Sequence, residues 1–243
     1  MLYVCFTYEK DLRLLALTSA RVRQLDPDAV FVAVPNRAAF SAMSVPEGVI
    51  QHVSNFDRGG NLNGLACIEG MLRTMAELMD LYQAEHCIKI DADCWCNDLS
   101  HWVKSTAEHS FDYLATERWH FGQPAGYIYR LSRRLVGRLL DDIAARRSAG
   151  LFPPSNKFPE DQTIYALAMQ NRAQCALVPF VSGRSTGLCE VEPEHLYRAL
   201  AADVVHLGEP MADGSRADRL TVYARAIILR DFIASNPPPR FEN

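Results

Sequence analysis

Two aspartates stand where an apolar segment of the sequence ends. The stretch CIKIDADCWC (87–96) begins as a buried strand should and then places Asp91 and Asp93 two positions apart. Side chains two residues apart point the same way along extended backbone, so the carboxylates converge if extended geometry continues through Ala92. Two such carboxylates repel unless a positive charge separates them, and hard cations such as Mg²⁺ or Mn²⁺ prefer oxygen ligands. D-x-D also occurs by chance, and an ordinary loop start or helix cap is the alternative interpretation.

The elements that must position this pair alternate between strand-like and helix-like segments. Apolar runs predict strands over 2–8, 29–34, 48–53, 86–91, 111–116, 126–131, 175–180 and 202–208. Helix-period stripes lie over 12–22, 65–79, 132–143, 164–168 and 220–228. Ser132 is the expected N-cap of the third of these helices. The alternation predicts an α/β fold, an open and mostly parallel sheet with helices on both faces, whose ligands bind beyond the carboxyl ends of the strands.

Composition and charge exclude several classes of function. A formal net charge of −4 gives no general attraction to nucleic acid, so no nucleic-acid partner is expected. No segment approaches the roughly 20 apolar residues of a membrane helix, and MLYVCFTYEK at the N-terminus lacks the basic leader of a signal peptide. The seven cysteines are odd in number and scattered, and Cys94-Trp95-Cys96 lacks the second pair that a zinc site needs. We therefore expect a cytoplasmic protein with no integral membrane segment, with Cys94 as a buried thiol.

Several motifs follow one another in an order known from one group of enzymes. A helix, an apolar strand, D-x-D and D-L run through LRTMAELMDLYQAEHCIKIDADCWCNDL (72–99), and PAGYIY (124–129), FPEDQTIYALA (158–168) and HLGEP (206–210) follow. Over roughly residues 60 to 210 this order resembles the nucleotide-sugar glycosyltransferases of the GT-A fold. It is most similar to their galactosyltransferase and glycogenin-like group. The chain departs from that pattern at Pro124, where Asn is usual, at Gly208, which comes one position early, and at Glu209, where a basic residue is usual.

The resemblance implies one GT-A-like catalytic domain over 1–243, with a nucleotide-binding half at about 1–98 and an acceptor-binding half at about 99–235. It implies a metal-dependent glycosyltransferase, of the hexosyltransferase type. The donor would be a nucleoside-diphosphate sugar, with UDP-sugar favoured, and the acceptor a saccharide or another hydroxyl compound. Mn²⁺ or Mg²⁺ would be held by Asp91, Asp93 and His206, although His206 is equally well explained as a structural histidine of a strand.

Asp161 and Gln162 are the candidate catalytic residues by the same resemblance. Asp161 would lie near the anomeric carbon of the donor sugar, with Gln162 as its polar neighbour. The pair Glu160-Asp161 also resembles the E-D of inverting GT-A enzymes, in which the Asp is the catalytic base, so the stereochemistry stays open. A helix N-terminus favours acidic residues whatever the function, which is the alternative explanation.

Further candidates for binding the donor lie near the ends of the early strands and in the Gly-rich turn FDRGGNLNG (56–64). They are Thr7, Tyr8, Asn36, Arg58, Asn61, Lys89 and Asp91, the last shared between metal and ribose. Simpler explanations exist for each: Tyr8 as an aromatic at the rim, the turn as a capped helix start, and Lys89 as a structural ion-pair partner of Asp91.

Two other functions remain open at this stage. A sugar-nucleotide nucleotidyltransferase has a related sheet, but its Gly-rich basic loop after the first strand is replaced here by TYEKDLR (7–13). A non-catalytic module that binds a nucleotide sugar is the other, because Pro124 and Glu209 depart from the pattern of the active enzymes.

Overall fold

The structure is a computed structural model of the 243-residue chain. It describes residues 1–8, 11–35, 44–54, 64–103, 111–118, 123–151, 160–178, 181–182 and 204–206. The helix expected over 220–228 lies outside the described residues. Within these ranges, no helix combines the length and the apolar character needed to cross a membrane.

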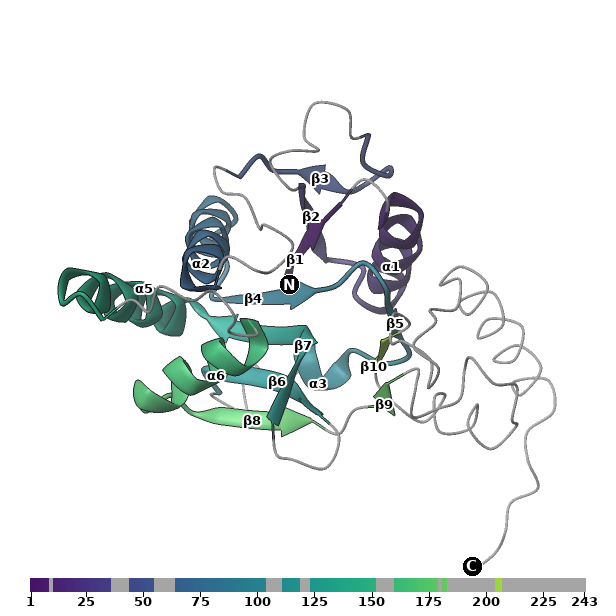
Figure 1. Ribbon diagram of the computed structural model, residues 1–243. Helices are drawn as coiled ribbons and strands as arrows, with labels where there is room; N and C mark the ends of the chain where they lie inside the picture. Colours follow the sequence, from purple (N-terminus) through teal and green to yellow (C-terminus); the bar gives the residue numbers. More distant parts are fainter. Residues whose placement is uncertain are drawn as a thin grey trace, which may run out of the picture.

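A seven-stranded sheet in the order β3-β2-β1-β4-β7-β6-β8 forms the centre of the molecule (Figure 1). Its strands are β1 (Leu2–Thr7), β2 (Val30–Pro35), β3 (Ile50–Gln51), β4 (His86–Ile90), β6 (Tyr113–Arg118), β7 (Gln123–Ser132) and β8 (Cys175–Val178). The β1–β2, β1–β4, β2–β3 and β6–β8 pairs are parallel, whereas β7 is antiparallel to both β4 and β6. All strands except β7 therefore share one direction, which confirms the mostly parallel sheet.

Helices cover both faces of the sheet, as the alternation of elements predicts. The helices are α1 (Leu12–Leu25), α2 (Gly64–Leu81), α3 (Ser100–Val103), α5 (Arg133–Ser148) and α6 (Glu160–Gln170). In β1, Leu2, Val4 and Phe6 belong to the core with α2, α5 and α6. Tyr3 and Cys5 point the other way, into the core with α1 and α3. The period-2 alternation of this strand thus supplies two separate apolar layers.

The helix α2 shows why its sequence forms this element. Met71, Leu72, Met75 and Met79 recur at helical spacing and are all fully buried. Burying each such side chain contributes about 1.5–3 kcal/mol to the stability of the fold. This packing against the sheet stabilises the segment as a helix.

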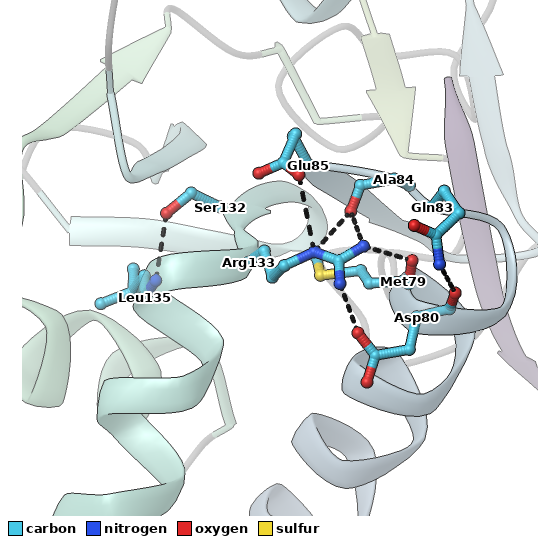
Figure 2. A network of polar contacts seen from close by, with 8 residues as sticks. All are labelled: Met79, Asp80, Gln83, Ala84, Glu85, Ser132, Arg133 and Leu135. Carbon is cyan, nitrogen blue, oxygen red and sulfur yellow. Dashed lines mark hydrogen bonds and ion pairs between the residues drawn. The ribbon is translucent and has the colours of Figure 1, made fainter.

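Arg133 fixes the end of α2 to the start of α5 (Figure 2). Its guanidinium donates to the carbonyls of Met79 at 2.6 Å and Ala84 at 3.0 Å, and it forms an ion pair with Asp80. Gln83 adopts a positive φ of 50° here, and Ala84 N–H donates to Met79 O at 2.9 Å, as in a Schellman turn. The carbonyls at the end of α2 are thereby satisfied, and the chain turns directly into β4.

Asp112 joins the starts of β6 and α5. The Ser132 hydroxyl accepts the Leu135 N–H at 3.1 Å, which confirms Ser132 as the N-cap, and donates to Asp112 Oδ1 at 2.8 Å. Arg134 and the Gln174 N–H also donate to the Asp112 carboxylate. Burial opposes the charge, but these three donors outweigh it and lower the pKa of Asp112.

A second, three-stranded sheet forms beside the first in the order β5-β10-β9. Its strands are β5 (Cys94–Cys96), β9 (Val181–Ser182) and β10 (Val204–His206). β10 falls within the predicted strand 202–208. β5 is not predicted by the sequence, because a three-residue strand has no periodicity of its own and its partner β10 lies over 100 positions later in the chain.

Candidate active site at the carboxyl edge of the sheet

The two aspartates lie on a tight turn, not on a continued strand. β4 ends at Ile90, and the Cys94 N–H donates to Asp91 O at 3.3 Å, which closes the turn. Extended geometry, the condition under which the two carboxylates would converge, does not continue through Ala92. The physical reason lies in α1: the Thr18 hydroxyl is 2.6 Å from Ala92 O and 3.0 Å from Cys94 O, which draws both carbonyls toward that helix.

Both carboxylates of the turn act electrostatically on the thiol of Cys94. Asp93 is buried, with 6% of its surface exposed, whereas the Asp91 side chain is 26% exposed. Burial of the Cys94 thiol raises its pKa well above its usual range, and the charges of Asp91 and Asp93 raise it further. Cys94 is therefore the buried neutral thiol that the sequence predicts.

Lys89 provides the positive charge next to this pair. Its Nζ lies 2.7 Å from Asp91 Oδ1 and 3.5 Å from Glu160 Oε1, and it also donates to the carbonyl of Gly126. The side chain is only 2% exposed. Of the two roles expected for Lys89, the structure therefore shows the ion pair with Asp91.

Glu160 begins α6 and faces the same lysine. Tyr129 of β7 lies opposite Lys89 in the β4–β7 ladder, and its hydroxyl donates to Glu160 Oε1 at 2.8 Å. Burial first, and then the charge of Glu160, raise the pKa of Tyr129 well above its usual range. The phenol therefore stays protonated and acts as a donor to Glu160.

Asp161 packs against the backbone of Gly126. A Cβ atom at position 126 would lie 3.1 Å from Asp161 Cβ and 3.4 Å from its Cγ, which is closer than most carbon contacts allow. The Gln162 N–H donates to Asp161 Oδ1 at 2.8 Å, so the first turn of α6 orients this carboxylate. The Gly126 carbonyl also accepts a hydrogen bond from Lys89, which forms an ion pair with Asp91. Asp161 and Asp91 are thus linked through Gly126 and Lys89.

His206 reaches the turn through the small sheet. In the antiparallel pair of β10 and β5, His206 stands opposite Cys94, the residue that follows Asp93. The backbone of a segment more than 100 positions away is thus paired with the residue that follows D-x-D. Among the residues that the structure describes, however, no three His, Cys, Asp or Glu side chains form a group that could hold a metal ion.

Of the remaining candidates for binding the donor, two lie within the described residues and three lie outside them. Thr7 ends β1 at the same edge of the sheet, is 1% exposed and donates its hydroxyl to Tyr8 O at 3.4 Å. Tyr8 follows it and is partly buried. Asn36, Arg58 and Asn61 lie outside the described residues.

Sequence reasoning missed Thr18 and Tyr129. Thr18 is a buried polar residue on the apolar face of α1, and that mismatch was the available signal. Tyr129 had no comparable signal, because only the antiparallel register of β7 places it opposite Lys89.

Comparison with known proteins gives the fold. No known protein family matches the sequence, and no curated protein matches it either. Among solved structures, the chain is similar to the galactosyltransferase LgtC in complex with donor and acceptor sugar analogues, at 13% identity and a TM-score of 0.52, covering 94% of this chain and 96% of that one. It is also similar to a glycosyltransferase involved in glycosylating the major capsid of PBCV-1 (12% identity, TM-score 0.53, 93% and 98% covered). A third is the glycosyltransferase GlyE of Streptococcus pneumoniae TIGR4 (10% identity, TM-score 0.50, 99% and 65% covered). The chain therefore has the fold of the GT-A glycosyltransferases.

Proposed function

We propose that this protein is a metal-dependent glycosyltransferase that moves a sugar from a nucleoside-diphosphate sugar to an acceptor hydroxyl. The observation that carries the proposal is the meeting of the D-x-D turn and the acidic first turn of α6 around Lys89 and Gly126. This meeting lies at the carboxyl edge of a sheet, where α/β folds bind ligands. UDP-sugar is the favoured donor, a hexose the favoured sugar, and a saccharide or another hydroxyl compound the acceptor.

Asp91 and Asp93 are the residues that would hold Mn²⁺ or Mg²⁺, with His206 as the third ligand. Carboxylate oxygens suit these hard cations. When bound, such a cation neutralises the departing diphosphate as a Lewis acid.

Asp161 has the role of the carboxylate next to the sugar. In the reaction, the bond between the anomeric carbon and the diphosphate oxygen breaks, a bond from that carbon to the acceptor oxygen forms, and the acceptor loses a proton. A carboxylate held by Gln162 N–H and by Gly126 can stabilise positive charge on the sugar or receive that proton. Gln162 is the polar neighbour at this place.

The donor's base and ribose are assigned to the ends of the early strands. Thr7 ends β1 and Tyr8 follows it, and Asn36 comes directly after the last residue of β2 in the sequence. Arg58 and Asn61 precede α2 and are proposed to contact the diphosphate. The whole chain, 1–243, would then serve as one catalytic domain, with its nucleotide-binding half at about 1–98.

The test is a donor panel. The protein is incubated with each common nucleotide sugar and Mn²⁺, and the release of nucleoside diphosphate is followed with and without EDTA. Release that EDTA abolishes supports the proposal. Formation of pyrophosphate would instead indicate a nucleotidyltransferase, and binding of the nucleotide sugar without turnover would indicate a binding module.

A further inference from the structure

Lys89 is a buried cation shared by three elements. It lies in β4, and its ammonium contacts Asp91 after β4, the carbonyl of Gly126 in β7 and Glu160 in α6. The ring of Tyr129 lies under it, with Nζ 5.5 Å from the ring centroid, and the Tyr129 hydroxyl donates to the same Glu160 oxygen. No contact to a donor molecule is needed to explain this lysine.

The charges around Lys89 explain why these elements hold together. The Glu160 side chain is only 11% exposed and that of Asp91 26%, so both carboxylates have lost much of their contact with water. Two carboxylates so placed would repel each other and favour protonation without a cation between them. Lys89 supplies that cation, and α6 is thereby fixed to the end of β4 through its first turn.

The geometry points to Lys89 as a positioning residue that sets the distance between the metal-binding turn and the catalytic carboxylate. Asp161 follows Glu160 directly, so holding Glu160 against Lys89 also sets where Asp161 lies relative to Asp91. In this role the Lys89–Glu160 ion pair acts by positioning other residues, not by contacting the sugar or the diphosphate. This inference rests on the proposed function, because it assigns the pair a role in the transfer.

The test compares Lys89→Met, Glu160→Gln and the double variant with wild type. We expect Lys89→Met to lower kcat by about a hundredfold, because displacing the Asp161 carboxylate by about 1 Å should slow the transfer by about that factor. The KM for the nucleotide sugar should change by less than about threefold, because uniform binding of the donor is untouched. The losses should not add, so the double variant should be about as active as Lys89→Met.

A readout independent of activity is the binding of Mn²⁺. Removing a cation 2.7 Å from Asp91 takes away a repulsion, so the Kd of Lys89→Met for Mn²⁺ should stay the same or fall. Amide hydrogen exchange should become faster across α6, 160–170, in both single variants. The control is Arg147→Met, which breaks an ion pair with the buried Glu69 between α5 and α2 and should leave exchange in α6 unchanged.

Each result decides between the two proposals. A rise in KM with kcat unchanged would make Lys89 a donor ligand and overturn the inference, as would strictly additive losses or unchanged exchange in α6. If wild type releases no diphosphate from any donor, the proposed function fails and the transfer role of the pair fails with it. Faster exchange in α6 would then still establish the structural link.

Discussion

At the scale of single residues, Gly126 is the position where a small change should have a large effect. Its missing Cβ leaves room for Asp161, and a methyl group there would meet the Asp161 Cβ at 3.1 Å. We expect Gly126→Ala to displace this carboxylate by a few tenths of an ångström and to lower kcat for diphosphate release by about tenfold. The measurement is a steady-state assay with the donor identified by the panel.

The control for this variant is Gly137→Ala. Gly137 lies on the exposed side of α5, and a Cβ there would meet nothing within 4 Å. This variant should keep full activity and gain about 0.5–1 kcal/mol in the free energy of unfolding, because glycine costs that much inside a helix. Equal activity of Gly126→Ala and Gly137→Ala would contradict the place given to Asp161.

Some site residues could be predicted from the sequence and others could not. Asp91, Asp93 and Asp161 stand in local motifs that the sequence shows directly. The structure brings the end of β4 and the start of α6 together around Lys89. The turn at Ala92 was missed because it depends on Thr18, a residue over 70 positions earlier in the chain. Tyr129 was missed for the same kind of reason, since strand register is a long-range property.

At the scale of elements, α1 holds the D-x-D turn through one hydroxyl. Thr18 is 1% exposed, and its single O–H is shared between the turn carbonyls of Ala92 and Cys94. Thr18→Val keeps the shape and removes the donor, so we expect the free energy of unfolding to fall by about 1–3 kcal/mol, the cost of leaving buried carbonyls unsatisfied. Chemical denaturation measures the change.

Thr74→Val, in α2, is the matched control for Thr18→Val. The Thr74 hydroxyl is also buried, but it donates only to Gly70 O, one turn earlier in the same helix. This hydrogen bond should add little to the free energy of unfolding, because the Gly70 carbonyl already accepts a backbone N–H within α2. The account of α1 fails if both threonine variants lose the same stability.

Asp112, which joins β6 to α5, should make the free energy of unfolding depend on pH. Its pKa is lowered in the folded state, so the folded protein binds this proton less readily than the unfolded chain. The stability that Asp112 contributes is therefore complete above the pKa of an unfolded aspartate, about 3.9, and is lost as the pH falls through the folded pKa. Asp112→Asn should cost about 1–3 kcal/mol at pH 7, and this cost should shrink below about pH 4. Unfolding curves of both proteins between pH 7 and pH 3 measure it, and a cost independent of pH would contradict the assignment.

At the scale of the whole molecule, the fold was largely predictable and its closing pieces were not. The period-2 and helical patterns predict the α/β class, the mostly parallel sheet and helices on both faces, and each is confirmed. The reversal of β7 was not evident, because direction within a sheet depends on which strands pair. Nor was β5, whose pairing with β10 brings His206 beside the turn.

The whole arrangement brings acidic groups from distant parts of the chain to one edge of the sheet. β4 leads into the turn, β7 carries Gly126 and Tyr129, and α6 carries the second acidic pair. These elements are joined by backbone pairing and by buried polar contacts.

The most direct test of the central claim is the binding of Mn²⁺ to Asp93→Asn, measured by electron paramagnetic resonance of the free ion. The control is Asp141→Asn, which removes an exposed aspartate of α5 far along the sequence from the turn. We predict that wild type and Asp141→Asn bind one Mn²⁺ with the same affinity, and that Asp93→Asn binds it at least about tenfold more weakly. Equal affinity of all three proteins for Mn²⁺ would contradict the claim that the D-x-D turn holds the metal.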